Sequence, residues 1–532
     1  HLEAAGDWAV ACELAEALLA RGGSSARQRA RFAERGKLTD VVALAMAETR
    51  GQYAPPVATL ALTAGYTGTG EDEALAGAGV PHLSYRPVFA ILDELGVTEL
   101  NRRAAAAANA AIADGFTFGA EGRQQPFPID LVPRIVAPHE WAALATGLTQ
   151  RARALEMFLE DIYGPARIVD AGILDWSTVH DGPEWLAAAR DLPGDVVRAP
   201  VIGFDLVRDS LGGWRVLEDN TRVPSGVGYA IGIRHLLQRA MPELGVGAAL
   251  RDPGTALSLI GDTLRAISGR EEPVVALLSD GADNSAWYEH RMIAAGAGLL
   301  LVQPDEVVVE GGRVHAGGRR VDVLYLRLSA DLLHLRDSGG KPIGERIWAA
   351  ACEGAVRLAN APGSGVADDK AMYCLVPDFI SYYLGERPLL APVATYRCAN
   401  SAERESVLQR LGELVTKPVD GYGGGGVLIG PDASPVEVET RRGEIEANPR
   451  GWIAQEVVAL STHPVLDGGR LQPRHVDLRA FVYVSGTGSS DARLADLALT
   501  RVAPAGSMVV NSSRGGGVKD TWLVIDPNDD GR

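Results

Sequence analysis

The sequence has few cysteines and no long apolar run. Only 4 cysteines occur among 532 residues, and they show no CxxC pair and no spacing typical of metal sites. Scattered cysteines in so long a chain indicate reduced thiols. No segment reaches the roughly 20 apolar residues that a membrane-spanning helix needs, and no signal-peptide pattern opens the sequence. A disulfide scaffold and a membrane protein are therefore excluded, and we expect a cytoplasmic protein.

Positive charge is also scarce. The chain has 51 Lys and Arg against 68 Asp and Glu, a formal net charge of −17. Nucleic acids and anionic membranes attract basic surfaces, so neither is expected as a partner. A nucleotide remains compatible, because it needs only a local basic and glycine-rich cradle. The sequence leaves oligomerisation open.

The length and the order of predicted elements indicate a multidomain α/β and α+β protein. Residues 1–75 show helical periodicity and predict an N-terminal extension. A strand–helix–strand alternation in residues 273–330 predicts a parallel α/β unit, and residues 411–470 predict a smaller α+β unit. Further helices are predicted at 101–114, 348–360 and 368–383, and further strands at 127–134, 478–484, 498–503 and 507–510.

A glycine loop stands between two predicted strands. Lys417 to Gly426 reads KPVDGYGGGG. Glycine lets the backbone approach a phosphate closely, and Lys417 at the end of a strand can contact a phosphate as a point charge. The run lacks the Gly-Lys-Ser/Thr of a Walker loop. A flexible hairpin is the alternative, which the preceding Lys-Pro makes less favoured.

Oxygen ligands for a metal ion cluster on a predicted β-hairpin. Strands at 201–207 and 214–217 flank the turn Asp-Ser-Leu-Gly-Gly. Asp205 lies on the first strand, and Glu218 and Asn220 lie at the end of the second, pointing to the same side of the sheet. Such oxygens suit the Mg²⁺ of a nucleotide complex. An acidic turn closed by an Asx motif fits the pattern equally well.

A third group of polar residues lies in the last sixty positions. Strand alternation puts Asp477 and Arg479 on one face, where the guanidinium can meet an anion. Arg501-Val502-Ala503-Pro504 and Asn511 to Gly517 follow. Each piece alone could be a surface ion pair or a turn.

The order of these pieces resembles the motif series of the ATP-grasp superfamily, in particular its glutathione synthetase-like ligases, with the metal-binding end moved to the front. Local phrases are similar to the circularly permuted ATP-grasp family, type 2, relatives of glutathionylspermidine synthase-like ligases. The phrases include LEDNTRVPSG (217–226), GVADDKAMY (365–373) and VNSSRGGGVKDTW (510–522), and the similarity covers about residues 80–525.

The resemblance implies a permuted ATP-grasp core and a Rossmann-like pre-ATP-grasp domain. The expected boundaries are 1–75 for the helical extension, 76–272 for the core segment with the metal-binding strands, 273–395 for the pre-ATP-grasp domain, 396–470 for the lid with the glycine loop, and 471–532 for the C-terminal core segment.

The resemblance also implies roles for individual residues. Nucleotide contacts fall to Lys370, Lys417, Tyr422, Gly423, Gly424, Gly425, Gly426, Gln455 and Glu456, with the last two meeting adenine and ribose. Asp205, Glu218 and Asn220 would hold Mg²⁺, and Arg479, Arg501 and Arg222 would act in catalysis. Further substrate-side candidates are Arg134, Asn284, Glu289 and Arg327. Lys370 could instead be a solvated helix residue behind an Asp368–Asp369 cap, and Arg222 could pair with Asp219.

The function implied by the resemblance is ATP-dependent ligation of a small-molecule or peptide carboxylate to an amine through an acyl phosphate. The alternatives are an inactive ATP-grasp scaffold and a phosphotransferase. Leu326 and Gly425 depart from the family pattern, which leaves the substrates open. The hypothesis requires the region of Asp205 to Asn220 to face the region of Lys417 to Gly426 across one triphosphate.

Overall fold

The structure, a computed structural model, describes residues 60–68, 70–118, 125–245, 248–419, 425–489, 491–510 and 516–526. Most of the expected N-terminal extension, residues 1–59, lies outside these ranges. So does most of the glycine loop, including Tyr422, Gly423 and Gly424. Within the described ranges, no helix is long and apolar enough to cross a membrane.

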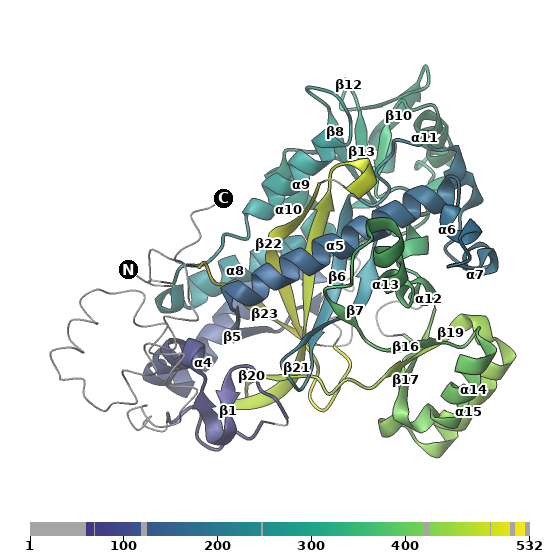
Figure 1. Ribbon diagram of the computed structural model, residues 1–532. Coiled ribbons are helices and arrows are strands. Elements are labelled where there is room, and N and C mark those ends of the chain that lie inside the picture. The colour runs from purple at the N-terminus through teal and green to yellow at the C-terminus, as the bar shows by residue number, and fades with distance from the viewer. Residues whose placement is uncertain are drawn as a thin grey trace, which may run out of the picture.

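An eight-stranded sheet forms the centre of the molecule (Figure 1). Its order is β15 (Ala391–Pro392), β7 (Trp214–Asn220), β6 (Val201–Arg208), β21 (Arg470–Val484), β22 (Ala492–Val502), β23 (Gly517–Leu523) and β5 (Ile129–Val136), and β20 (Thr462–Asp467) pairs with β21 outside this order. Strands β21 to β23 therefore lie between β6 and β5. Two stretches of chain about two hundred and fifty residues apart build one sheet.

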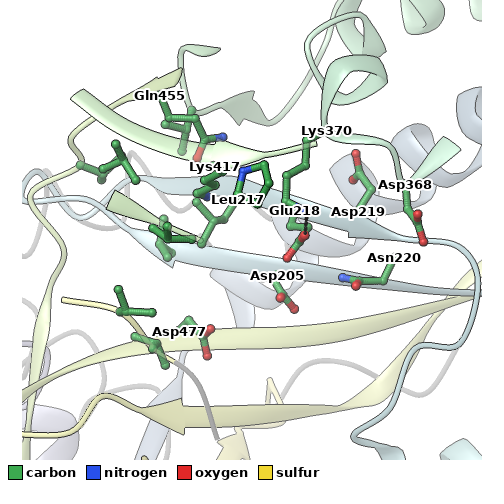
Figure 2. A pocket seen from close by; sticks show the side chains of 18 of the residues that line it. Asp205, Leu217, Glu218, Asp219, Asn220, Asp368, Lys370, Lys417, Gln455 and Asp477 are labelled. Atoms are coloured by element: carbon green, nitrogen blue, oxygen red, sulfur yellow. Dashed lines mark ion pairs between the residues drawn. The ribbon is translucent and has the colours of Figure 1, made fainter. Parts of the chain in front are cut away.

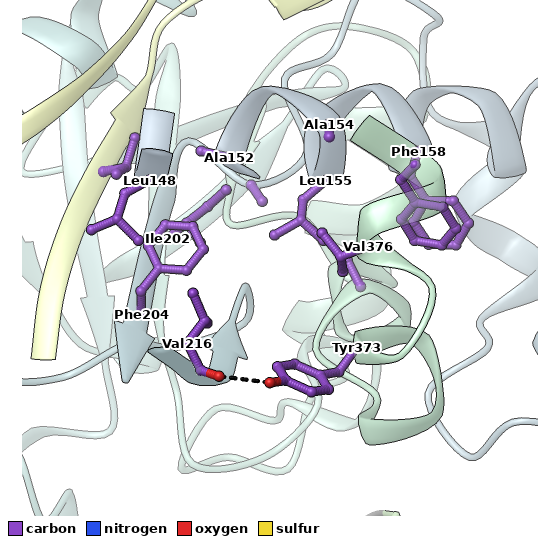
Figure 3. Close-up of a cluster of buried hydrophobic side chains, with 14 of the residues drawn as sticks. Leu148, Ala152, Ala154, Leu155, Phe158, Ile202, Phe204, Val216, Tyr373 and Val376 are labelled. Atoms are coloured by element: carbon purple, nitrogen blue, oxygen red, sulfur yellow. Dashed lines mark hydrogen bonds between the residues drawn. The ribbon is translucent and has the colours of Figure 1, made fainter. Parts of the chain in front are cut away.

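Strand alternation sends the two faces of this sheet to different helices. Ile202, Phe204 and Leu206 of β6 pack in one core with α5 (Pro138–Tyr163), which lies along the sheet in Figure 1. Figure 3 shows this core, in which Val216 accepts a 2.6 Å hydrogen bond from the hydroxyl of Tyr373. The opposite face packs on α8 (Val227–Ala240) and α9 (Thr255–Ala266).

A second sheet has four strands in the order β14 (Arg357–Ala359), β13 (Val323–Arg327), β8 (Val275–Ser279) and β9 (Leu300–Val302). All three pairings are parallel. Helix α10 (Trp287–Ala297) connects β8 to β9, and α11 (Ile343–Cys352) connects β13 to β14. The alternation predicted for residues 273–330 is thus present.

A third, antiparallel sheet stands to one side, at the lower right of Figure 1. Its order is β16 (Thr395–Arg397), β19 (Trp452–Glu456), β17 (Leu414–Pro418) and β18 (Leu428–Ile429), and α14 (Ser401–Gln409) and α15 (Pro435–Ala447) belong to the same unit. Asn400 and Ser434 cap these two helices by accepting hydrogen bonds from their first backbone N–H groups. Strand β17 carries Lys417 toward the central sheet.

Several predicted elements differ from the structure, among them the helix predicted at 368–383, which is broken into α12 (Lys370–Tyr373), α13 (Val376–Phe379) and a π-helical segment at Ile380–Leu384. The helix predicted at 348–360 ends at Cys352, because Gly354 turns the chain with a φ of 71° and residues 357–359 form β14. The strand predicted at 507–510 has no regular structure. The helix predicted at 101–114 is present as the second half of α4 (Arg86–Ala113), after the non-helical Gly96 with a φ of 71°.

Candidate functional site

A cavity of about 240 Å³ lies where the central sheet meets the smaller antiparallel sheet. Residues of β6, β7, β21 and β22 line one side, and residues of β17, β18 and β19 line the other. It brings together nearly all the predicted site residues that the structure describes, namely Asp205, Glu218, Asn220, Arg222, Lys370, Lys417, Gly425, Gln455, Glu456, Arg479 and Arg501. Gly426 lies beside this set without lining the cavity.

Four charged side chains form a row across three neighbouring strands. The sheet register pairs Arg479 with Asp205 and Asp477 with Arg501, and two-residue spacing puts Asp477 and Arg479 on one face. Arg479 binds Asp205 through Nε and Nη2, at 2.6 and 2.7 Å. Arg501 Nη2 donates to Asp205 at 2.8 Å, and its Nε donates to Asp477 at 3.0 Å.

These ion pairs hold the carboxyl group of Asp205 in its charged form. Burial alone would raise its pKa, but the guanidinium groups of Arg479 and Arg501 outweigh the burial and leave the pKa well below its ordinary value. The carboxylates of Asp205 and Asp477 raise the pKa of Arg501, although burial lowers it. The row thus presents two guanidinium groups to the cavity.

The predicted hairpin places its side chains as the alternation requires. Asp205 pairs with Glu218 in the register, and Figure 2 shows Asp205, Glu218 and Asn220 on the cavity side. Lys370 makes a 3.0 Å ion pair with Glu218. Asp219, between the two cavity-facing residues, points to the opposite face and binds Arg151 of α5 through two 2.6 Å bonds.

Lys417 enters the cavity from the smaller sheet (Figure 2). Desolvation lowers the pKa of its ammonium group to about 8, although Glu218 and Asp205 raise it. Lys417 and the carboxylates of Asp205 and Glu218 line the same cavity. Gly425 lines the same cavity, whereas residues 420–424 lie outside the described ranges.

Gln455 and Glu456 lie on β19 and point in opposite directions. Gln455 is buried and donates to Thr395 Oγ1 at 3.0 Å. The carboxylate of Glu456 accepts hydrogen bonds from Arg410 at 2.9 and 3.0 Å and from the hydroxyl of Tyr396 at 2.7 Å. The side chain of Glu456 is therefore already bound by residues next to the same small sheet, and Gln455 is the more available of the two to a ligand.

Arg222 lies at another end of the cavity, between two carboxylates. Its Nη1 donates to Glu184 at 2.6 Å, and its Nε donates to Asp368 at 3.1 Å. The suggested pairing of Arg222 with Asp219 is wrong, because alternation turns Asp219 toward α5. Asp369 caps the short helix α12 (Lys370–Tyr373), as suggested, but Lys370 reaches into the cavity.

The remaining substrate-side candidates do not line this cavity. Arg134 is buried and binds Glu73 at 2.6 and 2.8 Å. Arg327 is buried and binds Glu289 at 2.7 Å, and Glu289 in turn accepts the backbone N–H of Gly226 at 2.6 Å. The Arg327–Glu289 pair holds the loop that precedes α8. Asn284 bonds to the carbonyl of Arg327 at 3.3 Å and belongs to the same buried network.

Several cavity residues were missed from the sequence. Three of them are acidic, namely Glu184, Asp368 and Asp369, and many of the others are apolar: Val207, Leu217, Val393, Val415, Val419, Val427, Ile429, Val457, Val458, Leu460, Met508, Val509 and Val510. The Asp-Asp before Lys370 was visible as a helix cap. Glu184 and the apolar wall carry no local signal, because the fold alone brings them together.

The donor set at the hairpin fits Mg²⁺. Asp205 and Glu218 offer carboxylate oxygens, and Asn220 offers an amide oxygen. The amide nitrogen of Asn220 is buried and has no hydrogen-bond partner among the described residues, so its N–H groups are open to an acceptor such as a phosphate oxygen beside the metal. The described part of the chain holds no group of three His, Cys, Asp or Glu side chains disposed to bind a metal, so phosphate oxygens and water would fill the remaining positions.

Known proteins are similar to this chain in fold and in sequence. A solved structure of a glutathione synthetase-like effector from Globodera pallida aligns with a TM-score of 0.53 over 80% of this chain and 96% of its own, at 12% identity, which concerns the fold alone. The model of the circularly permuted ATP-grasp type 2 family matches residues 133–503, and the chain belongs to this family.

Full-length relatives are similar over most of this chain. The "Putative glutamate–cysteine ligase 2-3" of Frankia alni is 44% identical over 98% of this chain and 63% of its own length. An uncharacterized protein of Mycobacterium leprae is 41% identical over 83% of this chain and 80% of its own. The chain thus spans about 63% of the Frankia relative, less than two thirds of its length.

Proposed function

We propose that this chain is an ATP-dependent carboxylate–amine ligase that activates its acid as an acyl phosphate. The observation that supports this most directly is the shared cavity: the carboxylates of the β6–β7 hairpin and the lysine of β17 line one space of about 240 Å³, although they lie some two hundred residues apart. Opposed carboxylates and lysines suit a metal-bound triphosphate.

The cavity wall suggests how ATP would lie. The apolar side chains of β17, β18 and the segment after β19 suit the base, and Gln455 offers an amide for its edge. Lys417, Lys370 and the glycine loop would contact the phosphates, and Asp205, Glu218 and Asn220 would hold Mg²⁺. Bound there, Mg²⁺ would supply charge neutralisation for the phosphate oxygens.

Under this proposal the units take the following roles. Residues 76–272 and 471–532 form the permuted ATP-grasp core, which their shared sheet supports. Residues 273–395, with their parallel sheet, form a Rossmann-like pre-ATP-grasp domain. Residues 396–470 form the lid, in which strands β17 and β18 flank the glycine loop in the sequence.

The chemistry needs positioning and charge more than covalent participation. The acid's carboxylate attacks the γ-phosphorus and ADP leaves. Arg479 and Arg501 stabilise the negative charge that builds up, since both stay charged and both already point into the cavity. Asp477, which binds Arg501, fixes that guanidinium in place. An amine then displaces phosphate from the acyl phosphate.

The relatives' name suggests the first substrates to test. L-glutamate and L-cysteine come first, followed by other amino acids, dicarboxylic acids and primary amines. The longer Frankia relative carries sequence beyond this chain, so its named activity need not reside in the matched part alone.

The test is ADP release with MgATP and pairs from this panel, with the product identified by mass spectrometry. We expect an amide and free phosphate, and turnover abolished in Asp205→Asn. A stable phosphorylated acceptor would instead show a phosphotransferase. Tight MgATP binding with no turnover across the panel would favour a scaffold.

One argument for the scaffold weakens in the structure. Leu326, which departs from the family pattern, is buried in β13 among apolar neighbours and does not line the cavity. Only Gly425 among the noted departures touches the candidate site.

A further inference from the structure

One end of the cavity contains a carboxylate oxygen that has no partner in the described structure. The side chain of Asp368 is only 7% exposed. Its Oδ2 accepts hydrogen bonds from the backbone N–H groups of Thr221 and Arg222, at 3.2 and 3.3 Å, and from Arg222 Nε at 3.1 Å. Its Oδ1 is buried and accepts none from the described residues. A buried acceptor without a donor destabilises the folded state and calls for an explanation.

The position of Asp368 connects it to the proposed reaction centre. The backbone groups that bind Oδ2 directly follow Asn220 in the chain, and Asp368 lines the cavity together with Glu218 and Asn220. Figure 2 shows Asp368 on the same side of the pocket as Asn220. The free oxygen therefore lies beside the end of β7 that would hold the metal and the γ-phosphate.

The charge at this end favours a nitrogen over an anion. Glu184, Asp368 and Asp369 line it, and the guanidinium of Arg222 lies between the first two. Lys370 is directed to Glu218. Among the described side chains that line this end, three carboxylates stand against one guanidinium, and this negative charge attracts an N–H donor.

We propose that Asp368 binds the nitrogen of the amine substrate and accepts its proton during attack on the acyl phosphate. This inference rests on the proposed ligase function. In the step, the nitrogen forms a bond to the acyl carbon, the bond from that carbon to the phosphate oxygen breaks, and phosphate leaves with the electron pair. The N–H proton moves to Oδ1 and from there to phosphate or water. Arg222 and Glu184 act as positioning residues.

The environment gives Asp368 the basicity that this role needs. Burial raises the pKa of its carboxyl group to about 7, although Arg222 lowers it, and the neighbouring Glu184 raises it further. A base is most effective when its pKa lies near the working pH.

The test compares two nucleophiles in Asp368→Asn. Hydroxylamine is largely unprotonated at neutral pH and traps an acyl phosphate as a hydroxamate without a base. With MgATP and L-glutamate, or another acid from the panel that turns over, we expect the variant to form hydroxamate within about threefold of wild type. Amide formation with L-cysteine, or the accepted primary amine, should fall about 10²- to 10⁴-fold.

Two controls keep folding and chemistry apart. MgATP affinity should stay within about twofold in Asp368→Asn. Asp195→Asn removes a carboxylate that also pairs with an arginine, Arg357, at 2.6 Å but is largely exposed, and it should leave both reactions unchanged.

Equal losses with both nucleophiles would overturn the inference, because Asp368 would then act in phosphoryl transfer or folding. Equal retention would overturn it as well. If wild type forms no hydroxamate with any acid, the proposed ligase function itself fails and this inference fails with it.

Discussion

At the scale of single residues, Asp205 has two roles that compete for its carboxylate. It is bound by two arginines in the structure, and under the proposed function it must also hold a metal ion. Binding of MgATP would then move the carboxylate from the guanidinium groups to the cation and leave both arginines for the phosphoryl group. Under the proposed function, Asp205 thus binds the two arginines before MgATP arrives and frees them when it coordinates the metal.

Asp205→Asn should lower both stability and activity. Without the carboxylate, Arg479 keeps a buried charge with no carboxylate partner, whereas Arg501 keeps Asp477. We expect a loss of about 3–5 kcal/mol in the free energy of unfolding, measured in urea, and a fall in kcat of about a thousandfold.

The double variant Asp205→Asn/Arg479→Gln removes the unpaired charge and should recover part of the stability but none of the activity. Because the folded pKa of Asp205 is lowered, its stabilising effect is present at neutral pH and is lost only as the pH falls below its ordinary range. Equal stability of wild type and the single variant at pH 7 would contradict this account.

Lys417 should make nucleotide affinity depend on pH. Desolvation lowers the pKa of its ammonium group to about 8, so the charge is present at pH 7 and lost as the pH rises above 8. Titration calorimetry with MgATP should show an affinity that falls about tenfold between pH 7 and 9.5.

Lys417→Arg is the matched control, since its guanidinium keeps its charge throughout this range. It should remove the pH dependence, even if the geometry of the longer side chain weakens binding overall. The same fall in Lys417→Arg as in wild type would assign the dependence to another group.

At the scale of elements, α5 determines how the end of β7 is held. Arg151 in the middle of this helix binds Asp219, the residue between Glu218 and Asn220. The ion pair is almost fully buried, so the end of β7 cannot shift without breaking it. The helix therefore acts on the candidate site from the far face of the sheet.

Arg151→Met should destabilise the protein by about 3–5 kcal/mol, because Asp219 keeps a buried charge without its partner. We also expect weaker Mg²⁺ dependence of nucleotide binding, since the flanking side chains lose their support. Arg153→Met on the same helix breaks only the exposed 3.4 Å pair with Glu386 and should cost less than about 1 kcal/mol. Thermal unfolding of both variants in parallel decides the point.

The sequence predicted short-range features of these elements well. The β6–β7 hairpin follows from strand alternation around a glycine-rich turn, and with it the orientation of Glu218 and Asn220. The length of α5 and the fate of residues 348–360 could not be predicted in the same way. The helical propensities of both segments are ordinary. Packing against the sheet sets the length of α5, and Gly354 ends the helix within residues 348–360.

The sequence could not show which side chains far apart in the chain would bind each other. The family resemblance made Arg134 and Arg327 substrate-side candidates, but it could not show that the buried carboxylates of Glu73 and Glu289 neutralise them. Glu184 gave no signal at all. The order of motifs did predict which regions would meet, because it resembles a known family, and the shared cavity is in agreement with that expectation.

At the scale of the whole molecule, the central sheet and the smaller antiparallel sheet together form the cavity. A ligand bound between them should stabilise the assembled form by about 2.7 kcal/mol at a hundred times its Kd. MgATP should therefore raise the melting temperature in a concentration-dependent way, and ATP with EDTA should raise it much less. Equal shifts with and without Mg²⁺ would contradict a metal site at the hairpin.

The placement of β21 also bears on how the protein is made. This strand carries Asp477 and Arg479 and pairs with β6, yet it is synthesised more than two hundred and fifty residues later. Until it emerges from the ribosome, β6 has an unsatisfied edge, and the carboxylate of Asp205 has no arginine. Chains that stall before β21 would expose that edge, so we expect nascent chains of this length to depend on chaperones, and no nucleotide site to form before the last strands arrive.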